Sequence, residues 1–581
     1  MGAAAGAAQA FHLGAARARD NPGAARPLPA AGLRCYPGVM LRSVATVGAW
    51  TMASRILGFA RDMLIAAKLG AGPVSDAFFV ALRLPNLFRQ LFGEGAFNAA
   101  FVPAFAGTYA AEGPAAARAL ANALAGLMTL VLSGLVILGI VFMPQVLFVL
   151  APGFVGEALR FPLAVELTRI TFPYLLFICL AALVSGVLNG MDRFASAAAA
   201  PVLFNIVTMA ALLGLTPFVA TPAHALAWGV AASGVLQLAM LLVAARVAGM
   251  AINPLSRPRM TPGVRAVLRR MGPGVIGAGV TQVNLAIGII IGSLLPAGAV
   301  SYLYYADRIS QLPLGVIGAA VGTALLPLLA RQLRLGQRLS AHRSQNRAIE
   351  LTLAFALPAA FAMAVVAGPI IQALFERGAF GPEASAATAA ALIAYAVGLP
   401  AFVLVKALTP GFFARGDTAT PVKIGIAVVA LNLALNLLLT PAIGHVGIAL
   451  ATSVASWVNV AALGWLLMRR RRLVLDRRLR ARVPRLLAAA LVMCAVLAVL
   501  QAAIFPLAGG IVRLLGLAVL VGAGLATYFA AAHLLGGLNL REARAMLRRR
   551  GGYGCYLGGA TPLPRLRRHL DAAQPRFQHR A

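Results

Sequence analysis

Residues 118–150 read RALANALAGLMTLVLSGLVILGIVFMPQVLFVL, a run in which only the first residue is charged. An α-helix needs about 20 mostly apolar residues to cross the hydrocarbon core of a bilayer, so this run is long enough to span it. The composition of the whole chain agrees, because 61% of its 581 residues are hydrophobic and only 11% are charged. A soluble domain carries about 25% charged residues. The sequence therefore predicts a protein embedded in a membrane.

Apolar runs of similar length follow one another along the chain. They predict an all-α polytopic membrane protein with about fourteen transmembrane helices. Only helices and closed barrels satisfy their backbone groups in lipid, and these runs are too long for barrel strands. We place the helices at 43–67, 74–92, 118–150, 162–189, 197–217, 224–246, 271–294, 300–328, 349–375, 385–412, 422–440, 446–468, 484–506 and 511–535.

Arginine-rich loops alternate with loops that carry almost no basic residues. The segments 246–270, 331–347 and 469–483 are basic, as is the tail from Arg541, and each follows an even-numbered helix. Because cytoplasmic loops retain Lys and Arg, we expect both termini on the cytoplasmic side of the membrane. The formal net charge of +34 suits an anionic lipid surface, and no nucleic-acid-binding motif accompanies it. We therefore predict membrane lipids, and no nucleic acid, as partners.

The two halves of the chain repeat one another at a nearly constant offset. The sequence AGPVS from Ala71 matches AGAVS from Ala297, and AFNAAFVPAFA from Ala96 matches AVGTALLPLLA from Ala320. With six helices in each repeat, both halves would face the same way, as two parallel six-helix lobes around a central cavity. A shared bias toward Ala, Gly and Pro is the alternative explanation.

Residues 1–39 lack a run long enough to span a membrane and are rich in Ala, Gly, Pro and Arg. We expect them to be a disordered leader, or to precede the true start at Met40. The remaining expected divisions are an N-terminal six-helix lobe (40–250), a C-terminal six-helix lobe (265–468), a basic cytoplasmic loop (469–483), two C-terminal helices (484–535) and a basic cytoplasmic tail (536–581).

Charged residues interrupt three of the predicted helices, where they are costly unless they face water or one another. Guanidinium groups bind phosphate bidentately, so several of them with fewer acids predict an anion-binding cavity. The acids would hold the arginines in place or exchange partners as the cavity changes side. Alternatively, Arg–Asp pairs merely fasten helices together, and Arg83 extends to the membrane interface. The charged positions are Arg55, Arg61, Asp62, Asp76, Arg83, Arg89, Glu94, Asp307 and Arg308.

Nothing in the sequence points to covalent chemistry. The cysteines form no CxxC pair, and the histidines lack metal-ligand spacing. We see neither a catalytic triad pattern nor a glycine-rich phosphate loop. The sequence therefore predicts a transporter and not an enzyme, with no cofactor and no metal site. The cysteines are Cys35, Cys179, Cys494 and Cys555.

Five motifs resemble the MurJ (MviN) family of lipid II flippases, and the resemblance runs from about Met40 to the last predicted helix. The family belongs to the multidrug/oligosaccharidyl-lipid/polysaccharide exporter superfamily, which implies two six-helix lobes, to which the family adds two helices. The motifs are SRILGFARD from Ser54, SDAFFVALRLPNLFRQLFGEGAF from Ser75, TFPYLLF from Thr171, SYLYYADR from Ser301 and LTPGFFARGDTATPVK from Leu408.

The resemblance implies export of lipid II, the undecaprenyl-pyrophosphate-linked muropeptide, to the periplasmic face for peptidoglycan synthesis. Cell-wall synthesis proteins are a further expected class of partner. Gln311 departs from the pattern, because some relatives carry an acid there. The resemblance assigns substrate binding to Arg55, Arg61, Arg89 and Arg308, and supporting or gating roles to Asp62, Asp76, Glu94, Ser301 and Asp307.

Three other functions stay open at this stage. A flippase for another polyprenyl-pyrophosphate-linked glycan would need the same arginines, and only the motifs favour lipid II. A cation-coupled drug exporter would favour an acidic, aromatic cavity, which the arginines argue against. A membrane scaffold without transport activity has little reason to keep charges inside its helices.

Overall fold

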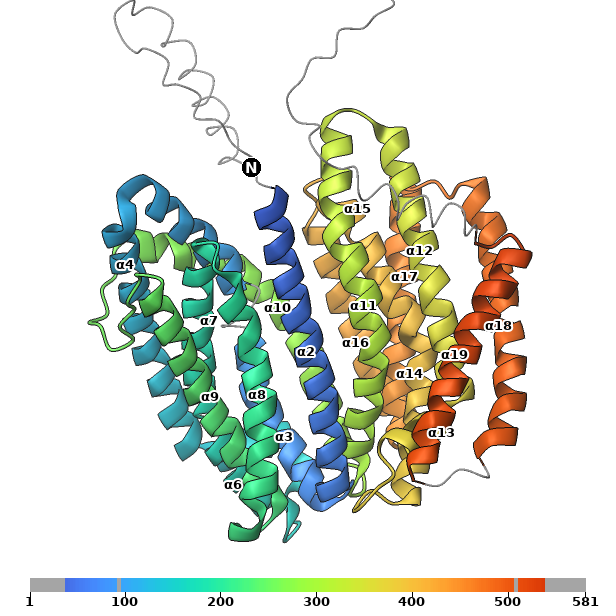
Figure 1. Ribbon diagram of the computed structural model, residues 1–581, viewed down its shortest axis with the longest axis horizontal. Coiled ribbons are helices and arrows are strands. Elements are labelled where there is room, and N and C mark those ends of the chain that lie inside the picture. Colours follow the sequence, from blue (N-terminus) through green and yellow to red (C-terminus); the bar gives the residue numbers. More distant parts are fainter. Residues whose placement is uncertain (1–36, 91–95, 506–509, 539–581) are drawn as a thin grey trace, which may run out of the picture. The chain divides into compact units, whose positions relative to one another are not determined.

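In a computed structural model of the protein, the structure describes residues 37–90, 96–505 and 510–538, and within these ranges the regular elements are all helices (Figure 1). Residues Thr46–Tyr553 form one compact unit. The other unit, Met1–Ala45 with Gly554–Ala581, lies almost entirely outside the described residues. The same holds for the expected leader and basic tail, and Glu94 also lies outside the described ranges.

The α-helices and 3-10 helices follow one another without intervening strands in the described part of the chain. In chain order they are α2 (Pro37–Leu69), α3 (Pro73–Phe88), α4 (Ala96–Val141), α5 (Met143–Leu150), η2 (Pro152–Phe154), α6 (Arg160–Thr171), α7 (Tyr174–Gly190), α8 (Phe194–Gly214), η3 (Thr216–Phe218), α9 (Pro222–Val247), α10 (Pro262–Ser293), α11 (Ala299–Arg334), α12 (Arg338–Val365), α13 (Ala367–Leu374), α14 (Pro382–Leu408), α15 (Pro410–Phe413), α16 (Ala419–Ile443), α17 (His445–Arg469), α18 (Arg477–Ile504) and α19 (Ile511–Leu534).

Among the described residues, 10 helical segments are long and apolar enough to cross a membrane. The predicted class, an all-helical polytopic membrane protein, is therefore confirmed. Four of the expected segments are helical but not among these 10, namely those that correspond to α2, α3, α10 and α11. Helices α2, α3 and α11 carry the charged residues that the sequence analysis selected. These charges lower the hydropathy of the three helices.

Several expected spans are divided into two helices next to a proline. The run 118–150 is broken at Phe142, where α4 ends and α5 begins with a proline in its first turn. The run 162–189 is divided between α6 and α7 at Pro173. Proline has no N–H and clashes with the preceding turn, so a long helix breaks there. Within α4, Gly113 adopts a φ of 87° and joins two helices.

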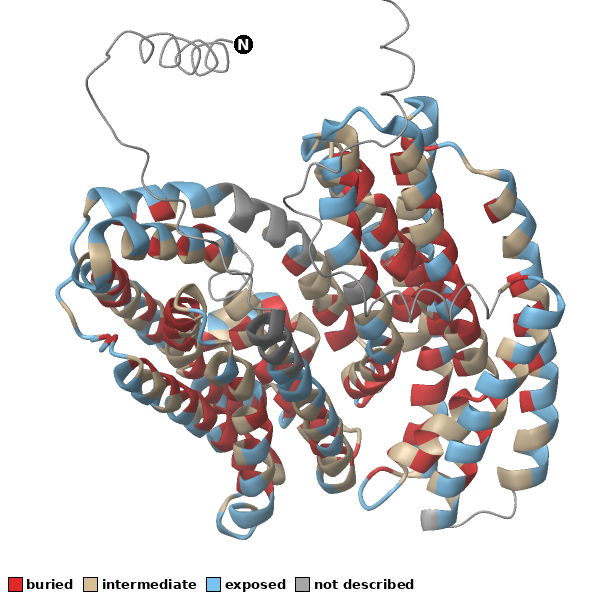
Figure 2. Ribbon diagram, turned by 45° about the horizontal axis from the view of Figure 1, so that its top comes forward, coloured by how far each residue is buried: buried red, intermediate tan, exposed pale blue. Residues whose placement is uncertain are grey.

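The helices of the compact unit form two groups (Figure 1). In the N-terminal group α8 packs on α9, α7 on α9 and α4, and α3 on α6. In the C-terminal group α14 packs on α17, α12 and α11, while α16 packs on α17. The groups meet where α11 contacts α3 and where α10 contacts both α4 and α16. Buried residues line the facing sides of the helices in both groups (Figure 2).

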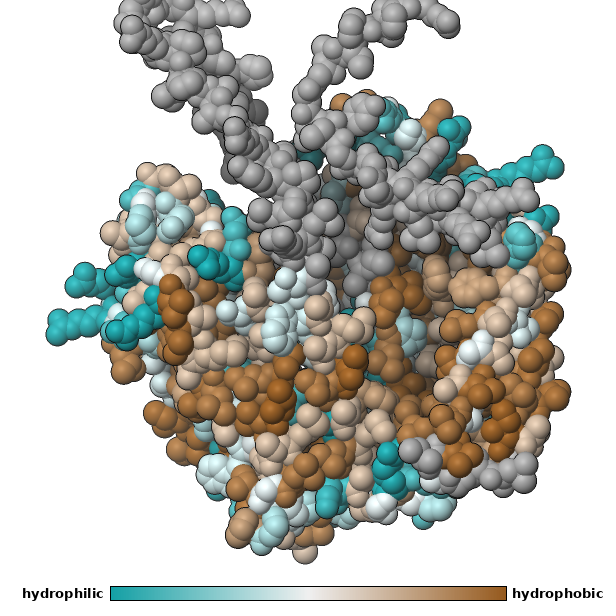
Figure 3. Space-filling view, viewed as in Figure 1, coloured by the Kyte–Doolittle hydropathy of each residue, from teal (hydrophilic) through white to brown (hydrophobic). Residues whose placement is uncertain are grey.

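Large apolar side chains also cover outward-facing surfaces (Figure 3). Examples are Leu138, Val243, Leu437 and Val499, which are 58%, 62%, 61% and 74% exposed. A soluble protein rarely exposes extended apolar surface of this kind. These faces are suited to contact with lipid, as the composition predicts.

The last two helices, α18 and α19, are fastened to the C-terminal group near both of their ends. Glu350 of α12 pairs with Arg482 of α18, and Glu376 pairs with Arg513 of α19 at 2.9 Å. Between these pairs, the buried Tyr528 hydroxyl donates a 2.7 Å hydrogen bond to a backbone carbonyl of α12. The hairpin is therefore held by buried polar contacts as well as by apolar packing.

Candidate functional site

A cavity of about 700 Å³ lies between the two helix groups, among α2, α3, α7, α8, α9 and α11. Uncharged polar side chains, mostly amides, contribute to its wall, including Asn86, Asn205, Gln237 and Gln311. Its charged lining residues are Arg55, Arg61, Arg83, Arg89, Asp307 and Arg308.

Two glycines let arginines reach across the space between α2 and α11. A Cβ atom on Gly58 would lie 3.1 Å from the Arg308 guanidinium, and one on Gly315 would lie 2.5 Å from that of Arg55. Each glycine therefore leaves room for an arginine of the opposite helix. The charged groups of α2 and α11 share the cavity because these positions lack side chains.

Asp62 of α2 is the carboxylate that joins this helix to α11 beside the cavity. It is 0% exposed and accepts hydrogen bonds from Arg61 Nε and Nη2 at 3.1 and 2.8 Å. Its other oxygen pairs with Arg308 on α11. The Arg61 guanidinium also lies 5.2 Å from the centre of the Phe204 ring, which orients it further.

Arg55 and Arg83 are less neutralised than Arg61 and Arg308. Among the described residues, Arg55 and Arg83 have no carboxylate within ion-pair distance. Arg89 donates to Asn86 Oδ1 at 3.2 Å, at the end of α3. On α11, Gln311 donates to the Asp307 carboxylate. Five arginines and the carboxylate of Asp307 thus line the cavity, and Asp62 pairs with two of these arginines.

The sequence analysis left open whether Arg83 extends to the membrane interface. Arg83 lies on the same cavity wall as Arg89. The two positions are six residues apart, which is about 9 Å along a helix. Long basic side chains in general tend to reach toward the membrane interface. This tendency could not indicate that the Arg83 face of α3 lines the cavity.

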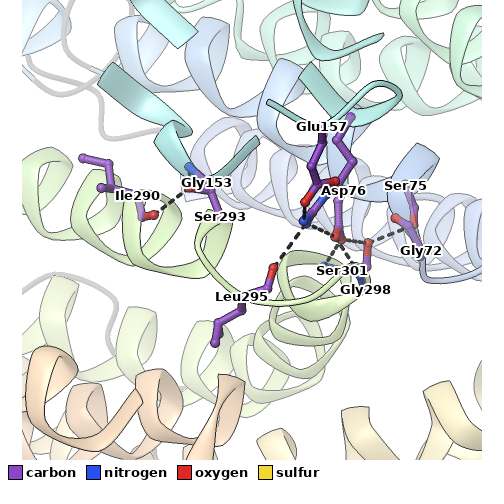
Figure 4. A network of polar contacts seen from close by, with 11 residues as sticks. Gly72, Ser75, Asp76, Gly153, Glu157, Ile290, Ser293, Leu295, Gly298 and Ser301 are labelled. Carbon is purple, nitrogen blue, oxygen red and sulfur yellow. Dashed lines mark hydrogen bonds and ion pairs between the residues drawn. The ribbon is translucent and has the colours of Figure 1, made fainter. Parts of the chain in front are cut away.

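A contact that we call the seam closes one end of the space between the helix groups. It joins residues 67–76 and 153–160 to residues 293–301 and 378–379. Its centre is Asp76, which is 0% exposed and sits in the first turn of α3 (Figure 4). The amide nitrogens of Gly298 and Ser301 donate to its carboxylate at 2.7 and 2.9 Å.

The Ser301 hydroxyl completes this arrangement. It lies 2.6 Å from the Asp76 carboxylate and 2.9 Å from the Ser75 hydroxyl. Ser75 and Ser301 are matching positions of the internal repeat. The beginnings of α3 and α11 therefore meet across the seam, with the carboxylate of one helix bound to the first amides of the other.

Arg160 and Glu157 also belong to the seam, and the sequence analysis did not select them. The Arg160 guanidinium pairs with Glu157, lies 3.8 Å from Asp76 and donates to the Leu295 carbonyl at 3.3 Å. Its hydrogen bond to Glu157 holds the pKa of that carboxyl below its ordinary value. No local pattern marks Arg160, because its partner Leu295 is 135 residues away in the sequence.

Close backbone approaches reinforce the seam. Gly70 has a φ of +65°, and a Cβ atom there would lie 2.4 Å from the Ala379 carbonyl oxygen. Gly378 has a φ of +59°, and its Cβ would lie 2.3 Å from the Ala67 oxygen. Only glycine fits such a backbone conformation without strain. Ala379 N donates to the Ala67 oxygen at 2.9 Å between them.

The structure thus divides the residues that the sequence analysis selected between two places. Asp62 and Asp307 lie with the arginines at the cavity, whereas Asp76 and Ser301 lie in the seam. Within the described ranges, no group of three or more His, Cys, Asp or Glu residues could hold a metal ion. The four arginines that were assigned to substrate binding, Arg55, Arg61, Arg89 and Arg308, all line the cavity.

A polytopic membrane protein with two helix groups, a charged cavity between them and a closed seam has the architecture of a transporter. Two solved structures show the same fold. A structure titled "Lipid II flippase MurJ, inward closed conformation" aligns with a TM-score of 0.69, at 24% identity, over 86% of this chain and 99% of that one. An inward-facing MATE-family multidrug transporter aligns with a TM-score of 0.61 at 14% identity, over 74% and 98% of the two chains.

Sequence comparisons identify the family. The family model described as "Lipid II flippase MurJ" matches residues 65–516. A probable lipid II flippase MurJ of Rhizobium tropici is 44% identical over 88% of this chain and 97% of its own length. Its counterpart in Rhizobium meliloti (strain 1021) is 45% identical over 88% of this chain and 96% of its own length. The chain belongs to the lipid II flippase MurJ family, a family of multi-pass membrane flippases and not of enzymes.

Proposed function

We propose that this protein moves lipid II from the cytoplasmic to the periplasmic leaflet of the bacterial inner membrane. The observation that carries the proposal is the arginine-rich cavity between the two helix groups. A pyrophosphate is a compact, strongly negative group, and guanidinium groups bind its oxygens bidentately. We assign its binding to Arg55, Arg61, Arg89 and Arg308, and we add Arg83 because it lines the same cavity.

The proposed orientation places both termini in the cytoplasm and the seam on the periplasmic side. The seam contains the segments that follow the first and seventh predicted helices, which lack the arginine clusters of the opposite end. The cavity would then load from the cytoplasm while the seam is closed. Breaking the contacts of Asp76 and Ser301 would open the periplasmic side, and the cargo would leave there for the cell-wall synthesis proteins.

We further propose that binding exchanges the partners of Asp62. In the structure its carboxylate is shared by Arg61 on α2 and Arg308 on α11. A pyrophosphate brings more negative charge than one carboxylate and would compete for both arginines. The exchange loosens a connection between the groups when cargo arrives, so loading and rearrangement would be linked.

The two predicted lobes, 40–250 and 265–468, are proposed to rock against each other during this cycle. The hairpin of α18 and α19 would move with the second lobe, because ion pairs fasten it near both ends. We propose that the polyprenyl tail stays in lipid beside this hairpin. No covalent step is required.

The test is the exposure of lipid II on the outer face of cells that are depleted of their own flippase and supplied with this chain. Arg61→Ala and Arg89→Ala are the test variants. Arg257→Ala, in an exposed loop between α9 and α10, is the matched control. We expect the intact chain and the control to restore exposure, and the two cavity variants to fail at equal expression.

Two results would contradict the proposal. If the cavity variants restore exposure as well as the control does, the arginines do not handle the pyrophosphate. If the intact chain inserts correctly and restores nothing, lipid II is not its cargo in that host. Other polyprenyl-pyrophosphate-linked glycans would then be the substrates to test.

A further inference from the structure

A second cavity, of about 530 Å³, lies beside the first among α2, α7 and α8. Five residues line both cavities, so the two spaces adjoin one another. The shared residues are Ser54, Arg55, Ser185, Ala197 and Pro201, and Val47, Thr51, Asn189, Phe194 and Ala198 line the second cavity only.

The ends of the three helices determine where this side cavity lies. Its residues on α8 come from the first turns of that helix, and those on α7 come from the last turns. At the wall of the neighbouring arginine cavity, Asn205 Nδ2 of α8 donates to the Ser54 carbonyl of α2 at 3.1 Å and holds the two helices together. Small side chains at Ser185, Ala197 and Ala198 contribute to the wall of the side cavity.

The chemistry of the side cavity differs from that of the arginine cavity. Arg55, at the junction, is the single charged residue among those that line it. Within the described structure, the side chains of Ser54, Ser185 and Asn189 make no hydrogen bond. Hydroxyls and amides both donate and accept hydrogen bonds. They are therefore suited to neutral hydroxyl and amide groups of a ligand, whereas the guanidinium groups next to them are suited to its phosphates.

The structure of the cargo limits what can lie next to the arginines. A pyrophosphate in lipid II carries the polyprenyl chain on one side and the sugar with its peptide on the other. A cavity that adjoins the pyrophosphate site must therefore receive one of these two parts. The uncommitted polar groups favour the glycopeptide. A cavity of 300–1,000 Å³ holds about one drug-sized ligand, so the side cavity has room for part of the larger glycopeptide.

We propose that the side cavity among α2, α7 and α8 is a binding subsite for the hydroxyl- and amide-bearing glycopeptide of the cargo, with Ser185 and Asn189 as its polar contacts. This inference rests on the proposed function. It makes the subsite a determinant of cargo specificity, since the arginines recognise any polyprenyl pyrophosphate.

The test compares the affinity of the purified full-length protein, in lipid nanodiscs, for two probes. One is lipid II and the other is a polyprenyl pyrophosphate without sugar or peptide. Asn189→Leu removes the amide at similar volume, and Ser185→Leu fills the cavity. Asn189→Ala is a milder variant in case either change impairs folding. Ala195→Leu, at an exposed position of α8 outside both cavities, is the control.

We expect Asn189→Leu and Ser185→Leu to weaken lipid II binding about tenfold, the effect of losing one or two neutral hydrogen bonds. Binding of the glycan-free probe should not change with Asn189→Leu, because Asn189 lines the side cavity only. Equal weakening for both probes, or no weakening for either, overturns the inference and leaves the proposed function standing. If the unchanged protein binds neither probe, the proposed function itself fails, and the inference fails with it.

Discussion

The seam provides the most direct test of how the protein closes, through the substitution Asp76→Asn. The side chain keeps its shape and loses its charge. In the structure its carboxylate accepts three hydrogen bonds, from Gly298 N, Ser301 N and the Ser301 hydroxyl, at 2.7, 2.9 and 2.6 Å. An amide has one acceptor oxygen, and its NH₂ group would face at least one of these donors.

The expected magnitude follows from these contacts. A hydrogen bond to a charged group contributes about 1.5–3 kcal/mol. The amide of the variant would keep part of this network, and the contributions of neighbouring hydrogen bonds are not additive. We therefore expect the closed state to lose about 3 kcal/mol of stabilising free energy. The free energy of the open state should change little, because water solvates the side chain of either Asp or Asn there. At 1.4 kcal/mol per factor of ten, the ratio of closed to open protein should fall about 100-fold.

In the proposed orientation, thiol labelling from outside the cell measures the open population. The reporter is Ala182→Cys, a position in the cavity wall, in a chain without its four native cysteines. A membrane-impermeant maleimide is added to spheroplasts, and the initial labelling rate is recorded. The rate should rise about 100-fold with Asp76→Asn, or until the open state predominates. The control is Asp192→Asn, at an exposed position with a φ of 60° that Asn adopts as readily as Asp.

An unchanged labelling rate would refute this reasoning, provided that the variant is expressed and folded like the control. The three hydrogen bonds would then form without holding the seam closed. The apolar contacts and glycine approaches around them would have to supply the closing energy instead.

Three further predictions concern the cavity, the seam and the hairpin. Asp62→Asn leaves Arg61 and Arg308 without their shared carboxylate, which costs about 3–5 kcal/mol of stability. The midpoint of thermal unfolding should therefore fall. An unchanged midpoint contradicts the joining role of Asp62. Gly70→Ala brings a Cβ to 2.4 Å from a carbonyl oxygen and should speed outside labelling, unlike Gly72→Ala, whose Cβ meets nothing within 4 Å. Glu350→Gln removes an ion-pair partner of α18, worth roughly 1–3 kcal/mol, and should increase amide hydrogen exchange in that helix. The exposed Glu112→Gln should leave exchange there unchanged.

The cavity could be predicted from sequence because its signal is local. A charge inside an apolar run must face water or another charge, whatever the rest of the fold does. That argument applies separately to Arg55, Arg61, Arg89 and Arg308, and the structure places all four on one cavity. The predicted helical class has the same basis, since the length and hydropathy of each run are properties of the run alone.

The seam could not be predicted in this way. Asp76 was selected because it is charged, but its partners Gly298 and Ser301 lie 222 and 225 residues away. Arg160 was not selected, because it stands at the beginning of an apolar run, where basic residues are common and carry no special signal. The helix breaks at Phe142 and Pro173 were also missed, since hydropathy does not register a proline that divides a run.

The internal repeat explains how the seam can act on the cavity. The matching positions Ser75 and Ser301 begin α3 and α11, but only α3 continues with an acid, because Tyr302 stands where Asp76 stands in the first repeat. The contact is therefore one-sided: a carboxylate of α3 binds the amide end of α11, where the helix dipole favours an anion. Arg308 lies about 10 Å further along α11 and pairs with Asp62 of the other helix group. Because one continuous helix carries both contacts, opening the seam must also move Arg308 relative to Asp62. A cargo that takes Arg308 from Asp62 consequently acts on the same helix that the seam holds at its other end.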